Sequence, residues 1–166
     1  MANADYYLQI DTIKGESEAK GFEEQMQIQS WSFGATNSGS SGVGTGAGTG
    51  KVSLQDFHFV IQNGKASVQL FLACCQGNHI PKAVLSCRKT GGNGTPYTYY
   101  TVTFQDLVIS SFQTGGSDGS GALPMESISF NFTKITQEYS QQKADGSVER
   151  TNSVVYDTKK VEGSGA

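Results

Sequence analysis

The chain has 166 residues and carries 12 basic and 15 acidic side chains, for a net charge of −3 at pH 7. That balance argues against a nucleic-acid partner, because nucleic-acid-binding domains usually present a basic surface. Glycine occurs 21 times and proline only 3 times, which favours strands and turns over a helical bundle. No apolar run is long enough for a membrane-spanning helix, and the first residues lack the basic and apolar regions of a secretory signal peptide. We therefore expect a protein made in the cytoplasm, with no membrane insertion.

Alternating apolar and polar residues predict the first two strands of the chain. One strand covers residues 6–10, and a second covers about residues 22–33. In the second strand the apolar residues occupy even positions up to Ile28 and odd positions from Trp31 onward. A bulge would cause this change of phase, and so would a strand that is covered on both faces.

A long glycine-rich segment follows at residues 37–50, with six glycines, three serines and no charged residue. It is longer than an ordinary hairpin loop and has no side chains that could form a core. Its end resembles a phosphate-binding loop, but Thr45 stands where that motif needs glycine, and Val52 stands where it needs serine or threonine. The sequence therefore predicts an extended loop without a nucleotide site.

One helix is predicted, from about residue 67 to residue 76. Ser67 is a suitable N-cap, and Gly77 suits the position after the last turn. The apolar residues spaced as on one helical face predict the side that packs on the core; they are Val68, Phe71, Leu72 and Cys75.

Further strands are predicted at residues 52–61, 83–88, 97–112, 126–134 and 148–159. The clearest alternation places Ile128, Phe130 and Phe132 on one face of its strand. About seven antiparallel strands with one helix favour a barrel or a sandwich, because either closure leaves fewer open sheet edges. We expect a single domain over residues 1–160 and a flexible tail at 161–166.

No group of side chains predicts catalysis. The three cysteines and His79 do not have the spacing of a structural zinc site, and Cys74 and Cys75 lie in an apolar helix where free cysteine usually packs as a small hydrophobe. His58 lies within a strand and is more often structural there. We therefore expect no catalytic residue, no metal and no cofactor, and the surface itself becomes the candidate for function.

Several short segments are distributed in a recognisable order over nearly the whole chain. They are Lys14-Gly15-Glu16-Ser17, Ser30-Trp31-Ser32-Phe33-Gly34, Gly50-Lys51-Val52, Gln55-Asp56-Phe57, Ala73-Cys74-Cys75-Gln76-Gly77-Asn78-His79, Pro81-Lys82-Ala83, Arg88-Lys89, Val108-Ile109-Ser110-Ser111, Thr114-Gly115-Gly116-Ser117 and Gln142-Lys143-Ala144-Asp145-Gly146. None is a chemical motif by itself. Their order and spacing resemble the haemolysin-coregulated protein (Hcp) family, the inner-tube subunit of the bacterial type VI secretion system.

The resemblance implies a mainly β fold, namely a small antiparallel β-barrel with one flanking helix and a long glycine-rich extended loop. It implies that six copies close into a ring, that rings stack into a tube, and that a contractile sheath expels the tube with its spike. The implied partners are further copies of this chain, the sheath and spike proteins, and small effector proteins in the pore. The protein would be cytoplasmic when made and secreted to the extracellular space or into a target cell.

The resemblance also implies two candidate sites. In the family the glycine-rich loop extends from the ring and contacts the adjacent ring, and the strand that contains Ser30 and Ser32 lies along the pore. These two serines are therefore the candidate contacts to cargo. The candidate ring-stacking residues are Ser41, Gly42, Val43, Gly44, Thr45, Gly46, Gly48 and Gly50.

Three other functions remain open from the sequence. A ring could act as a lumenal chaperone or carrier of secreted effectors, and the chain could be a phage-type tail tube protein. An enzyme is the third alternative, with His79 as its candidate base.

Overall fold

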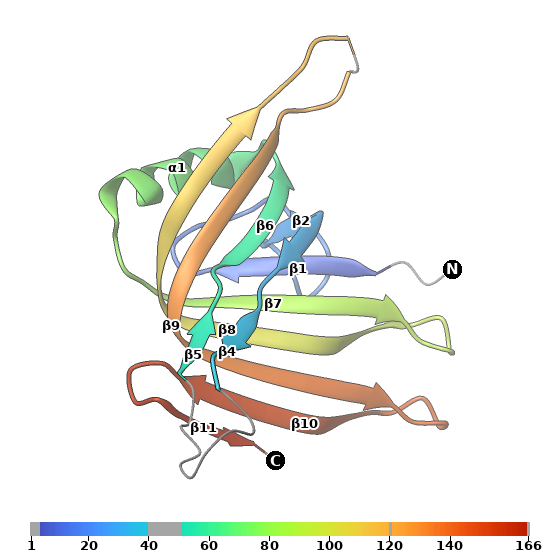
Figure 1. Ribbon diagram of the computed structural model, residues 1–166. Coiled ribbons are helices and arrows are strands. Elements are labelled where there is room, and N and C mark those ends of the chain that lie inside the picture. The colour runs from blue at the N-terminus through green and yellow to red at the C-terminus, as the bar shows by residue number, and fades with distance from the viewer. Residues whose placement is uncertain (1–3, 40–50, 120, 166) are drawn as a thin grey trace.

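The computed structural model describes residues 4–39, 51–119 and 121–165, and in these ranges the chain forms eleven strands and one helix (Figure 1). All the strand pairs are antiparallel. The elements are β1 (Asp5–Ile10), β2 (Met26–Ile28), β3 (Ser30–Ser32), β4 (Ala35–Asn37), β5 (Val52–Leu54), β6 (Phe57–Gln62), α1 (Lys65–Gln76), β7 (Ile80–Thr90), β8 (Pro96–Gly115), β9 (Met125–Gln142), β10 (Val148–Asp157) and β11 (Glu162–Gly165).

One large sheet holds nine of these strands, in the order β11-β10-β9-β8-β7-β1-β2, with β6 and β3 attached beside β9. The long strand β9 has two different neighbours on its second edge. Its first part pairs with β6, where Phe130 is opposite Phe57, and its later part pairs with β10, where Ile135 is opposite Tyr156. Because of this division the sheet curls around a core beside β6 and continues as an open extension towards β10 (Figure 1).

The segment 26–32 links the two ends of the curled part. Its first half, β2, pairs with β1, and its second half, β3, pairs with β6. Gln29, between them, donates its backbone N–H to the carbonyl of Val60 at 2.9 Å. The predicted mainly β class, the antiparallel pairing and the flanking helix are confirmed. In the described residues the sheet is curled, and two three-residue strands form the link between β1 and β6.

The core lies inside the curl and is built mainly from aromatic and branched side chains. Phe57, Phe59, Phe104 and Phe130 are fully buried, and their rings pack in tilted or edge-on contacts at centroid distances between 4.8 and 6.2 Å. Trp31 adds its ring to this cluster from β3, 6.3 Å from Phe57. Trp31 therefore faces the core. Burial of these large apolar surfaces is the main favourable term in folding.

The helix is confirmed, but its predicted buried face is wrong. Val68, Phe71, Leu72 and Cys75 are exposed, and the residues that pack inward are Ala66, Ser67 and Leu70. The N-cap is Gly64 rather than Ser67, whose hydroxyl oxygen accepts the Gly64 N–H at 2.9 Å. Gly77 ends the helix in the left-handed conformation, at φ 63°, as its sequence position predicts.

Two of the predicted strands are divided in the structure. The predicted strand at residues 22–33 begins only at Met26, because residues before it form a loop in which Gly15 donates to the carbonyl of Glu24 at 2.7 Å. A Cβ at Gly15 would collide with the backbone of Gln25, so glycine permits this close approach. The predicted strand at 52–61 is interrupted between β5 and β6.

The last residues contain a strand that the sequence does not predict. Residues 161–166 are predicted as a flexible tail, whereas Glu162–Gly165 forms β11 and pairs with β10. Its side chains carry no apolar group, so period-two alternation gives no signal there. The division into one domain over 1–160 and a separate tail stays a prediction.

Candidate assembly surfaces

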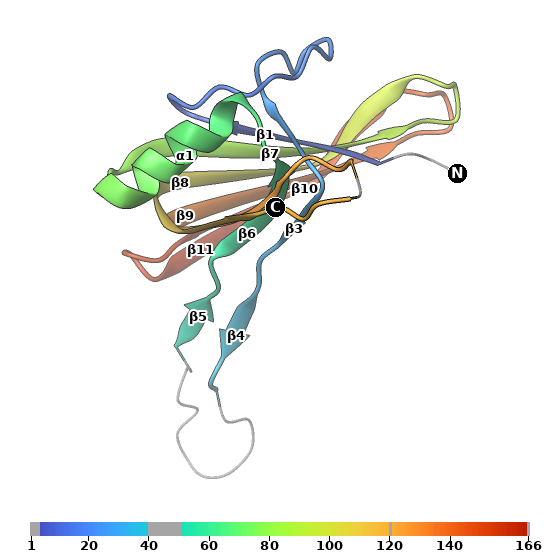
Figure 2. The ribbon, with the colours of Figure 1, turned by 90° about the horizontal axis from the view of Figure 1, so that it is seen from above.

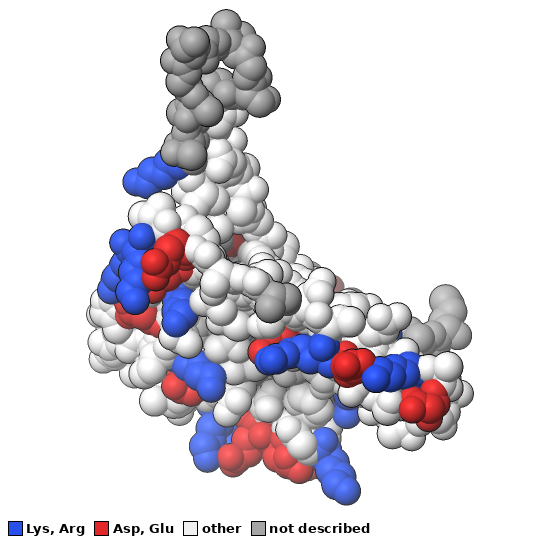
Figure 3. Space-filling view, turned by 90° about the horizontal axis from the view of Figure 1, so that it is seen from below, with Lys and Arg blue, Asp and Glu red and all other residues white. Residues whose placement is uncertain are grey.

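The β4–β5 hairpin projects from the body of the molecule (Figure 2). Its register pairs Ala35 with Leu54 and Asn37 with Val52, and no charged residue occurs in 34–39 or 52–55. In the space-filling view the described part of the projection is largely white with a basic group at its outer end, whereas basic and acidic groups intermix on the body beside it (Figure 3). Lys51, directly before β5, is exposed and is the charged residue of this projection among the described residues. The uncharged strands β4 and β5 can approach another protein without desolvating ions.

The eight predicted ring-stacking residues, between Ser41 and Gly50, lie outside the described residues. What the structure describes is the base that carries them, β4 and β5.

The two candidate cargo-contact residues lie on β3 and are both exposed. Ser30 is opposite Val60 and Ser32 is opposite His58 on β6. Trp31, between them, packs against the core. The alternation of a strand therefore directs the two serines away from the core, and their role toward cargo stays a prediction.

A row of small polar residues continues from Ser32 across three further strands. His58 is opposite Ser129 on β9, and Ser129 is opposite Ser111 on β8. Directly paired residues of an antiparallel sheet point to the same face, so the row is one continuous uncharged surface when His58 is neutral. Sequence reasoning named only the first member, because the row depends on the register of four strands.

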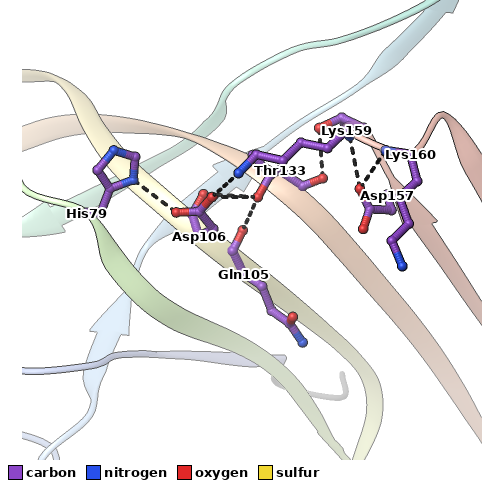
Figure 4. A network of polar contacts seen from close by, with 8 residues as sticks. His79, Gln105, Asp106, Thr133, Asp157, Lys159 and Lys160 are labelled. Atoms are coloured by element: carbon purple, nitrogen blue, oxygen red, sulfur yellow. Dashed lines mark hydrogen bonds and ion pairs between the residues drawn. The ribbon is translucent and has the colours of Figure 1, made fainter.

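A polar network surrounds Asp106 in the middle of β8 (Figure 4). Lys159 Nζ donates to Asp106 Oδ2 at 3.1 Å, and Thr133 Oγ1 lies at the same distance from that oxygen. His79 Nδ1 lies 2.9 Å from Asp106 Oδ1. Hydrogen bonds from Lys159, then His79 and Thr133, hold the pKa of the Asp106 carboxyl below its ordinary range.

The arrangement around His79 does not match a nucleophile relay. In such a relay the histidine lies between the hydroxyl and the carboxylate. Here Thr133 contacts Asp106 directly, and no hydroxyl or thiol among the described residues is hydrogen-bonded to His79. The network instead joins the segment between α1 and β7 to β8, β9 and the turn between β10 and β11.

The three cysteines occupy different environments and are all free. Burial raises the pKa of the Cys87 thiol to about 12, so that thiol is unreactive at neutral pH. Cys74 is half-buried and Cys75 is exposed, which contradicts the expected core packing of Cys75. In the described part of the chain no three His, Cys, Asp or Glu side chains gather as metal ligands would.

A buried carboxyl group escaped the sequence analysis. Glu126 on β9 is almost fully buried, and Asn63 Nδ2 donates to its Oε1 at 2.8 Å. Thr114 Oγ1 lies 3.4 Å from the same oxygen. A signal was available, because Glu126 has the same strand phase as the buried residues Ile128 and Phe130. Through these contacts Glu126 links the segment just before α1 to the β8–β9 hairpin.

Comparison with known proteins assigns a family to this fold. The profile described as "Type VI secretion system effector, Hcp" matches residues 7–139. The chain is 38% identical over 142 residues to Protein hcp1 of Pseudomonas aeruginosa, and the match covers 86% of each chain.

Solved structures agree with that assignment. Hcp1 from Salmonella typhimurium has a TM-score of 0.78 and 30% identity, with 99% of this chain and 100% of that chain covered. A protein described as a type six secretion system protein has a TM-score of 0.89 at 24% identity, with 98% and 100% covered, and supports the fold. Within the described ranges no helix is long and apolar enough to cross a membrane. The family profile and the Pseudomonas aeruginosa relative show that the chain belongs to the Hcp family of the type VI secretion system. The hexameric rings of this family form the secretion tube, and the chain is a subunit of that tube.

Proposed function

We propose that this chain acts as a structural and not a catalytic component, and that its rings stack through the β4–β5 hairpin. The observation that carries the proposal is the projection of a hairpin whose two strands carry no charge and whose connecting segment is rich in glycine (Figure 2). Glycine has no side chain, so backbones of two rings can approach closely there. The sheath and spike proteins of the same machine are the further proposed partners, and the type VI route is the proposed export path.

Size-exclusion chromatography with light scattering tests the ring. One chain has a mass of 17.7 kDa, so a sixfold ring has a mass of about 106 kDa. Electron microscopy of that peak should show a central opening. A monomer over a wide range of concentrations would contradict ring formation by the protein alone.

A second function, as a carrier of secreted effectors, is favoured by the uncharged row that begins at Ser32. If this face contacts cargo, Ser32→Trp should lower the level of a co-expressed effector while the ring mass is unchanged. Ser164→Trp on the edge strand β11 is the matched control, since Ser164 is also exposed. Equal effector levels in wild type and Ser32→Trp would reject the carrier function.

A further inference from the structure

The helix α1 presents an apolar face to solvent. Val68 is 73% exposed, Phe71 55% and Leu72 52%, and Cys75 lies on the same side. No charged residue occurs between residues 66 and 76. The opposite face fills the core contact through Leu70. On the outward face Phe71 packs edge-on against Phe112 of β8 at a centroid distance of 5.6 Å, and more than half of Phe71 remains exposed. An apolar helical face of this kind is typical of a protein–protein contact.

A groove lies beside this outward face. It has a volume of about 560 Å³ and extends between α1 and the Thr12–Ile13 turn. Leu72 and Ala73 form one wall, and Ile13 and Ile80 line the other. We call this groove and the exposed apolar side of α1 the helix face.

A second apolar surface lies on the open extension of the sheet. Val154 on β10 is 46% exposed and lies on the same side as Tyr139 and Tyr156, because Val154 is opposite Gln137 and Tyr156 is opposite Ile135. Ile135 belongs to the buried core, so this surface continues the core side of the sheet beyond the elements that cover it. We call it the sheet face. Tyrosine at its centre is a residue enriched in interfaces.

We propose that the helix face of one copy packs against the sheet face of the next copy in the ring. This inference rests on the proposed ring and identifies the lateral contact within it. The two faces differ in composition and lie at opposite ends of the curled sheet, with α1 at the top and β10 at the bottom of Figure 1. A chain with two different complementary faces associates head to tail, and such contacts close into rings.

The first test changes one residue on each face and measures mass by light scattering. Leu72→Asp and Val154→Asp should each shift the protein from the mass of the ring to the 17.7 kDa monomer. Leu123→Asp and Val148→Asp are matched controls, because Leu123 is 56% exposed and Val148 is 45% exposed. Val148 is opposite Gln142, which places it on the other side of β10 from Val154, and both controls should keep the ring. Circular dichroism of each variant verifies the fold.

The second test mixes the two monomeric variants. Each variant keeps one intact face, so the mixture should form a 1:1 dimer of about 35 kDa and no larger species. Rings in both Leu72→Asp and Val154→Asp would overturn the inference and leave the proposed ring intact. Monomers that fail to pair on mixing would show that the two faces do not meet each other. A monomeric wild type would instead contradict the proposed ring.

Discussion

At the scale of single residues, Asp106 shows how one side chain joins distant parts of the chain. Its backbone has φ 53°, a conformation that aspartate tolerates better than most residues. Thr133 is its neighbour across the strand pair, and the Thr133 carbonyl accepts two hydrogen bonds from Thr158 at 2.8 Å each. The sequence does not predict the contact between His79 and Asp106, because nothing in local periodicity connects residues 27 positions apart.

Replacing Asp106 by asparagine should lower the melting temperature at pH 7. The folded carboxyl has a lowered pKa, so its contribution to stability is present above the ordinary aspartate pKa and is lost as pH falls through the folded value. The difference in melting temperature between wild type and Asp106→Asn should therefore shrink towards about pH 3, near the aspartate pKa range. Asparagine also tolerates positive φ, so the substitution tests the charge.

Asp118→Asn is the matched control for that measurement, since Asp118 is exposed and forms no ion pair with another described residue. A melting-temperature difference for Asp106→Asn that stays constant with pH would show that the Asp106 charge does not stabilise the fold.

At the scale of elements, β9 and α1 differ in how well their patterns predict the structure. Strand β9 alternates cleanly, and its predicted inward residues Ile128, Phe130 and Phe132 are all buried. Helix α1 has apolar residues on both sides. The side with small residues packs on the sheet, because Ala66 and Ala73 let the helix approach closely, and Leu70 is buried between them. The larger apolar residues are left outside, so hydrophobicity alone selects the wrong face.

Removing the Phe130 ring should strongly destabilise the sheet. Phe130 is fully buried among four other phenylalanine rings, so Phe130→Ala should lower the free energy of unfolding by about 3–5 kcal/mol. Asn131→Ala, on the exposed side of the same strand, should change it by no more than about 0.5 kcal/mol. Urea unfolding at one protein concentration measures both. Equal effects would contradict the assignment of faces on β9.

At the scale of the whole molecule, the loop and the lateral faces should have separable roles. Deleting residues 42–48 should weaken ring stacking and leave the ring itself closed, because the deletion leaves the helix face and the sheet face unchanged. Electron microscopy counts stacked rings, and light scattering measures the mass of single rings. Equal loss of stacking and of ring closure would place the loop in the lateral contact.

The sequence by itself determined the mainly β class, the helix and most strand positions, because alternation and capping residues are local properties of a segment. The ordered segments between Lys14 and Gly146 also identified the family. Tertiary structure alone decided which face of α1 is buried, how β9 divides between β6 and β10, and that Asp106 meets His79 and Lys159. Those features depend on strand register and on side-chain packing between segments that are distant in the sequence. Several registers and packings agree with the same local pattern, and the contacts of the assembled fold select one of them.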